Sequence, residues 1–102
     1  MNFNETITKY NYVVFVCRTM QDFISLRKNF TNVFWNSPQG NETANGYIHQ
    51  KGNISFAFIN GMYDGWCHKE WFLQNNITRY SSNEWKIIHW ISCPTIIEVD
   101  DV

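Results

Sequence analysis

The clearest pattern along the chain is a continuous apolar run at residues 12–17, followed at once by a segment with helical spacing. The run has no charged position and is rich in β-branched side chains, which predicts a central strand covered on both faces. Thr19 can cap the helix that follows, and Asp22 lies three residues further on, near the positive helix end. Apolar residues then recur on one broad face as far as Phe30, so we expect the main helix to end near Asn32.

Shorter patterns further along the chain predict more strands and one small helix. Residues 46–50 and 54–59 alternate on either side of a tight turn and form the predicted hairpin. Asp64 can cap a second helix that ends near residues 75–76. The remaining expectations are a loop at residues 36–41 and strands at residues 85–91 and 95–99.

This order of elements predicts an α+β fold. One main helix would pack on a mostly antiparallel sheet of about four to five strands, with a short second helix. A length of 102 residues suits one domain, so we expect residues 1–102 to form a single compact domain. Residues 1–9 and 100–102 are polar or acidic, and we expect them to be flexible ends.

Charge and hydropathy narrow the classes of function. Eight Lys and Arg residues stand against nine Asp and Glu residues, for a formal net charge of −1. Nucleic-acid binding usually needs a basic excess, so we expect no nucleic-acid partner. No apolar run reaches the roughly 18 residues of a membrane span, and the polar N-terminus does not resemble a signal peptide. Together with an odd number of cysteines, these features predict a cytoplasmic protein with reduced thiols and no membrane partner.

Thirteen Asn residues place the glycosylation pattern Asn-x-Ser/Thr at five positions in the chain. Those positions are Asn4, Asn29, Asn41, Asn53 and Asn76. Because glycosylation requires a secreted chain, we interpret them as chance matches in an Asn-rich sequence.

The least charged part of the chain is its middle, where residues 29–63 contain only Glu42 and Lys51 as charged side chains. Aromatic rings offer a large rigid contact area, and Asn and Gly adapt their hydrogen bonds to a partner. Five Trp residues are also more than a domain of this size buries easily. The alternative is that Trp35 belongs to the core and that the loop around it is merely polar. The predicted partner-binding residues are Trp35, Asn36, Tyr47, Tyr63, Asp64 and Trp66.

Cysteine and histidine residues raise two kinds of chemistry that their spacing does not support. A zinc site needs four converging ligands, whereas His89 and Cys93 lie about 13 Å apart along a predicted strand. Neighbouring Cys67 and His68 would point to different sides. A Cys67 nucleophile with His49 or His89 as its base has no supporting motif around it. We therefore expect no catalytic residue, no metal and no cofactor, and a chain that is not an enzyme.

The layout of a first strand, a capped helix, a Trp-containing strand, a polar loop and a hairpin resembles a loose class of small accessory proteins encoded by bacteriophages. It covers most of the chain without matching a single family. Many proteins of this class inhibit or titrate a host component, often one of a defence system. The resemblance implies a non-enzymatic binding protein of the host cytosol, which inhibits a host protein by occupying a functional surface. The segments that carry it are residues 13–16, 19–32, 34–36, 54–59 and 66–72.

An alternative function is a small-molecule sponge that sequesters a nucleotide signal in a pocket at a subunit interface. Aromatic stacking would hold the base, and Arg27, Lys69 or Arg79 would contact the phosphate. In a third interpretation, exposed Trp side chains pair copies of the chain at a sheet edge, as a homodimer or a larger structural assembly.

Overall fold

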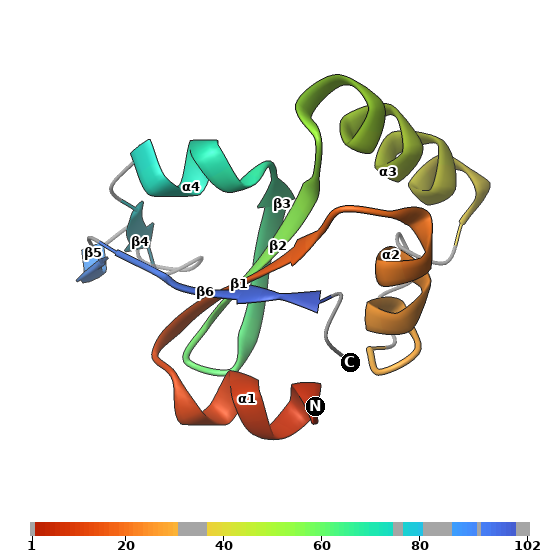
Figure 1. Cartoon of the computed structure of the whole chain (residues 1–102). Helices are drawn as coiled ribbons and strands as arrows, with labels where there is room; N and C mark the ends of the chain where they lie inside the picture. Colours follow the sequence, from red (N-terminus) through yellow and green to blue (C-terminus); the bar gives the residue numbers. More distant parts are fainter. Residues whose placement is uncertain (1, 31–36, 75–76, 81–86, 92, 100–102) are drawn as a thin grey trace.

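The computed structural model describes residues 2–30, 37–74, 77–80, 87–91 and 93–99, with the side chains of 77–80 and 87–91 left out. These residues form the α+β fold that the sequence predicts, with helices and strands intermixed along the chain (Figure 1). Its elements are α1 (Phe3–Lys9), β1 (Tyr12–Cys17), α2 (Met20–Arg27), α3 (Pro38–Lys51), β2 (Ile54–Ile59), β3 (Met62–Cys67), α4 (Lys69–Gln74), β4 (Ile77–Tyr80), β5 (Ile87–Ile91) and β6 (Thr95–Glu98).

A four-stranded mixed sheet forms the centre of the fold, in the order β3-β2-β1-β6. The pairs β1/β2 and β2/β3 are antiparallel, whereas β6 returns beside β1 in the parallel direction. Every residue of β1 and β2 is buried, which confirms the prediction of a central strand at residues 12–17. Strands β4 and β5 pair with each other in a separate two-stranded sheet.

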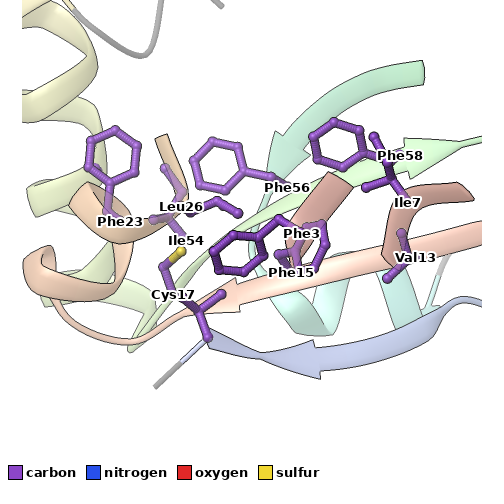
Figure 2. Packing of buried hydrophobic residues seen from close by; sticks show 12 residues of the cluster. Phe3, Ile7, Val13, Phe15, Cys17, Phe23, Leu26, Ile54, Phe56 and Phe58 are labelled. Atoms are coloured by element: carbon purple, nitrogen blue, oxygen red, sulfur yellow. The ribbon is translucent and has the colours of Figure 1, made fainter. Parts of the chain in front are cut away.

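Successive side chains of β1 and β2 point to opposite faces of the sheet, so each face has its own core. On one face, α1, α2 and α3 cover a cluster that includes Phe15, Phe56 and Phe58. Figure 2 shows Phe3 of α1 beside Phe15 in this cluster. On the other face, α4 inserts Phe72 against a smaller apolar cluster. Figure 1 shows α1 and α4 on opposite sides of the central strands.

The start of α2 agrees with the sequence, but its end does not. The Thr19 hydroxyl accepts a hydrogen bond from the Asp22 amide at 3.1 Å, and the Asp22 carboxylate accepts from the Thr19 amide at 3.1 Å, which forms a capping box. The helix ends at Arg27, several residues before the predicted end near Asn32. The Asn29 and Phe30 amides then donate hydrogen bonds to carbonyls three residues earlier, which turns the chain. The ring centroid of Phe30 lies 4.7 Å from that of Phe58 on the sheet.

The segment before β2 is helical, so the predicted loop at residues 36–41 and strand at residues 46–50 are wrong over residues 38–51. The Ser37 hydroxyl caps the first turn by accepting from the Gly40 amide at 3.0 Å, and Pro38 suits the first helical position. Gly52 ends α3 with φ +80°, a left-handed conformation that glycine adopts without strain. Helical geometry also places the small residues Gly40 and Ala44 on the buried face, which alternation of apolar and polar residues does not predict.

The hairpin is therefore formed by β2 and β3, one strand later than predicted. Asn60 and Gly61 make its two-residue turn with φ values of +51° and +80°, the backbone that such a turn requires. Asp64 does not cap a helix. It lies at a β-bulge in β3, where Gly65 has φ +140°, and the helix expected from residue 64 begins instead at Lys69.

The N-terminal segment forms a helix where the sequence predicted a flexible end. The Asn2 side chain caps α1 by accepting from the Glu5 amide at 3.2 Å. Phe3 is only 1% exposed, with its ring 5.2 Å from that of Phe15, so α1 is anchored to the sheet. The other predicted flexible end, residues 100–102, lies outside the described residues.

Among the buried side-chain nitrogen and oxygen atoms of the described part of the chain, one has no hydrogen-bond partner, the hydroxyl oxygen of Tyr12. Tyr12 is 4% exposed and lies in the smaller cluster beside Val14 and Ile59. Burial raises the pKa of Tyr12 above its ordinary value, and the negative charge of Asp64 adds to the shift. The hydroxyl therefore loses its hydrogen bonds to water without replacing them.

Replacing Tyr12 with phenylalanine should consequently leave the free energy of unfolding unchanged or raise it by up to about 1 kcal/mol. The Tyr12→Phe change removes only the unpartnered hydroxyl and keeps the ring that packs in the cluster. Urea unfolding of the two proteins, followed by circular dichroism, measures the difference. A clear loss of stability would mean that the hydroxyl has a bonding partner in solution.

Candidate functional site

The structure brings only some of the predicted partner-binding residues together. Tyr47 of α3 and Trp66 of β3 are in contact, with ring centroids 5.1 Å apart and planes at 79°. Tyr63 lies near the start of β3, where its ring centroid is 5.7 Å from that of Phe58. Asp64 is exposed at the bulge. The other two predicted residues, Trp35 and Asn36, lie outside the described part of the chain.

The three predicted contact rings that the structure describes are half-buried. Tyr47, Tyr63 and Trp66 all pack against the larger apolar cluster, under α3 and along one face of β3. Their burial reflects register, because Tyr63 pairs with Phe58 and Trp66 with Phe56, whose side chains point into that cluster. These rings therefore contribute to the core as well as to the surface.

Two of the predicted anion contacts, Arg27 and Lys69, lie on opposite faces of the sheet. Arg27, at the end of α2, lies over the Phe23 ring at 5.2 Å and donates a hydrogen bond to the Asn41 side chain. The Lys69 ammonium, at the start of α4 on the opposite face of the sheet, lies 3.9 Å from the Glu98 carboxylate. The Arg79 side chain is outside the described part of the structure.

A polar cluster surrounds His68, the residue that joins β3 to α4. We use the name β3–α4 corner for its members, which are Tyr47, Asn53, Trp66, Cys67, His68 and Glu70. The His68 ring nitrogen Nδ1 lies 3.1 Å from the Glu70 carboxylate, and the His68 ring centroid is 6.4 Å from that of Tyr47. The His68 carbonyl accepts from the Trp71 amide at 3.1 Å and so bonds to the first turn of α4.

Asn53 is the buried centre of this corner and is fully shielded from solvent. Its side-chain oxygen accepts from the Lys69 amide and from the Ser55 hydroxyl, each at 2.8 Å. Its side-chain nitrogen donates to the Lys51 carbonyl at 3.4 Å and to the Glu70 carboxylate at 3.3 Å. One amide group thus connects the end of α3, the start of β2 and the first turn of α4.

Electrostatics in the corner follow from these contacts. A hydrogen bond from its own backbone amide lowers the pKa of Glu70, and the bonds from His68 and Asn53 lower it further. Burial raises the pKa of Tyr47, and the neighbouring Cys67 thiol adds to the shift. The corner therefore holds an ionised carboxylate and a neutral phenol at neutral pH.

The described side chains do not assemble into a metal site or a catalytic site. In that part of the chain, no three His, Cys, Asp or Glu residues are grouped to hold a metal ion, and no pocket is formed. His68, which the sequence did not suggest as a catalytic partner, is the histidine adjacent to Cys67, and its ring contacts Glu70. His49 is exposed on α3, and the His89 side chain lies outside the described set.

The large exposed apolar side chains of the described structure are Met62, Trp71 and Leu73, which are 63%, 42% and 48% exposed. Trp71 and Leu73 belong to α4, where they lie to either side of the buried Phe72 around the helix, and we call these two residues the α4 patch. Neither was among the predicted contact residues. Consecutive helical residues are about 100° apart, so three apolar residues in a row cannot all face the sheet, which is the signal that sequence analysis missed.

Ion pairs beside the α4 patch connect the elements around it. The Arg18 guanidinium donates to both carboxylate oxygens of Glu98, at 2.7 and 3.1 Å. With Lys69 on the same carboxylate, the cluster links the chain after β1, the end of β6 and the start of α4. These groups are partly exposed, so each pair contributes at most about 1 kcal/mol and chiefly fixes geometry.

Comparisons of the chain with protein-family models, curated proteins and solved structures found no match. Geometry and exposure therefore define the candidate site. No helix in the described ranges is long and apolar enough to cross a membrane. By these criteria the α4 patch is the candidate contact surface, and the β3–α4 corner holds it in place.

Proposed function

We propose that the chain is a non-enzymatic binding protein that attaches to a partner protein through the α4 patch. The observation that carries the proposal is the exposure of Trp71 and Leu73, at 42% and 48%, on one short helix. Trp is among the residues that contribute most binding energy at protein interfaces, because its ring excludes water over a large area.

The contacts that hold α4 against the sheet favour a preorganised contact surface. Phe72 anchors the helix in the smaller apolar cluster, and the bond from the Lys69 amide to Asn53 holds its first turn. A side chain on an anchored helix loses less conformational freedom on binding than one on an unsupported loop. The patch is small, so we expect it to act as the centre of a larger contact.

The kind of partner follows from the resemblance to phage-encoded accessory proteins. In this proposal the partner is a bacterial host protein of the cytosol, such as a component of a defence system. The chain inhibits it by covering a surface that the partner needs for its own activity. No chemical step by the chain itself is required.

The test compares wild-type chain with the double variant Trp71→Ala/Leu73→Ala. A partner captured from a bacterial lysate by the immobilised wild type is purified, and its affinity for both proteins is measured by titration calorimetry. We expect the double variant to bind at least about tenfold more weakly, since loss of one central interface residue commonly costs more than 1 kcal/mol.

Met62→Ala is the matched control, because Met62 is the other large exposed apolar residue of the described chain and lies on β3. The proposal expects this variant to bind like wild type. Equal binding by all three proteins would exclude the α4 patch as the contact. A partner whose activity is unchanged when saturated with the chain would exclude inhibition.

A further inference from the structure

The sequence contains two Asn-Gly pairs, and the structure places them in different backbone environments. Asn45-Gly46 lies inside α3, whereas Asn60-Gly61 forms the turn between β2 and β3. Both asparagines are exposed. The two pairs therefore have the same local chemistry and differ in what the fold allows their backbones to do.

An Asn-Gly pair can rearrange when the main-chain nitrogen of the glycine reaches the side-chain carbonyl carbon of the asparagine. Inside α3, the amide of Gly46 belongs to the helical ladder, in which each amide donates to the carbonyl four residues earlier. The regular backbone on both sides also holds Asn45 in the helical conformation. Attack there requires a turn of α3 to unfold first.

The turn lacks the first of these restraints. Among the described groups, no hydrogen bond is made by the Gly61 amide, while the Asn60 amide donates to the Asn11 carbonyl at 2.8 Å. Gly61 has no side chain to shield its nitrogen, and the nearest outside atom to a Cβ placed there is the Ile7 carbonyl oxygen at 3.8 Å. Attack at Asn60 therefore requires a change of the turn beside the Ile59–Met62 pair and not the unfolding of a helical turn.

We infer that Asn60 is a site of spontaneous backbone modification, at which the folded chain forms a succinimide with Gly61 in preference to the Asn45-Gly46 pair. The Gly61 nitrogen bonds to Cγ of Asn60, the bond from Cγ to Nδ2 breaks, and ammonia leaves with the proton of the Gly61 amide. Water then adds to either ring carbonyl and opens the ring, which yields an aspartyl or an isoaspartyl linkage.

The product matters because the turn has only two residues. An isoaspartyl linkage adds one carbon to the main chain between Ile59 and Met62, whose pairing begins the β2–β3 ladder. Either product also adds a negative charge beside the polar turn. Ageing of the chain is therefore expected to loosen the start of β3, where Met62 and Tyr63 lie.

The test is peptide mapping by mass spectrometry after the folded chain is incubated in mildly alkaline buffer at physiological temperature. We expect the peptide with Asn60 to gain one mass unit several-fold faster than the peptide with Asn45. It should also become a substrate for an isoaspartyl methyltransferase. The variant Asn60→Gln, whose longer side chain would have to close a larger ring, should remain unmodified in the same period.

The same incubation in strong denaturant separates the effect of the fold from that of the sequence. Both Asn-Gly pairs should then react at similar rates, and Asn45 should gain most from unfolding. Equal rates at Asn45 and Asn60 in the folded chain would overturn the inference. So would protection of Asn60 in the folded chain as complete as that of Asn45.

Discussion

Replacement of Asn53 with alanine should lower the free energy of unfolding by about 2–4 kcal/mol. The change removes the side-chain oxygen and nitrogen of Asn53 together. The Ser55 hydroxyl and the Lys69 amide therefore lose their acceptor. The Lys51 carbonyl loses a donor in the same place. Each buried group left unpaired costs more than the net value of the bond it made, because water cannot reach it.

Urea unfolding measures this loss, and Asn4→Ala provides a chemically identical control at an exposed position. The Asn4 side chain makes one long bond, 3.5 Å from the Asn29 carbonyl, on the surface of α1. We expect that variant to stay within about 0.5 kcal/mol of wild type. If both changes had equal effects, the buried network would contribute nothing to stability beyond an ordinary surface amide.

Replacement of Phe72 with alanine should destabilise the chain by about 3–5 kcal/mol, the range for large-to-small changes in a core. Phe72 is 3% exposed and is the side chain by which α4 enters the smaller apolar cluster. Its removal leaves a cavity against β1 and β2 and frees a helix of only six residues, which cannot persist without packing.

Leu73→Ala is the matched control on the same helix, since Leu73 is exposed and its truncation should change stability by no more than about 0.5 kcal/mol. The two variants separate anchoring from binding. Phe72→Ala should lose stability and, with it, partner binding, whereas Leu73→Ala should weaken binding while unfolding like wild type. A stable Phe72→Ala variant with intact α4 would show that other contacts hold the helix.

The role of some buried residues can be explained only from the tertiary structure, and Asn53 is the clearest example. In the sequence it matches the glycosylation pattern Asn-Ile-Ser. In the structure the same spacing allows the Ser55 hydroxyl to donate to the Asn53 side chain on the buried strand β2. A pattern of three residues cannot show that the amide also bonds to Lys69 and Glu70, because those partners lie more than fifteen residues away along the chain.

The choice of candidate contact residues shows the same limit. Aromatic residues in a charge-poor segment were a reasonable prediction, but the register of β3 turns Tyr63 and Trp66 toward the larger core. Trp71 was not among the predicted contact residues, and it is exposed because its neighbour Phe72 occupies the side of α4 that faces the sheet. Composition predicts that some Trp side chains are exposed, whereas only the packing of each element decides which ones.

Local interactions determined what the sequence could predict about this protein. The unbroken apolar run of β1 and the Thr19–Asp22 capping box depend on adjacent residues alone, so the central strand and the start of α2 follow from the sequence by itself. Tertiary structure decided the rest, because the anchoring of α4 and the exposure of Trp71 depend on contacts with segments distant in the chain. The ends of α3 carry local signals, the Ser37 cap and Gly52, but only packing places Gly40 and Ala44 on its buried face. A short or weakly patterned segment takes the conformation that its partners stabilise, and those partners are absent from any local stretch of sequence.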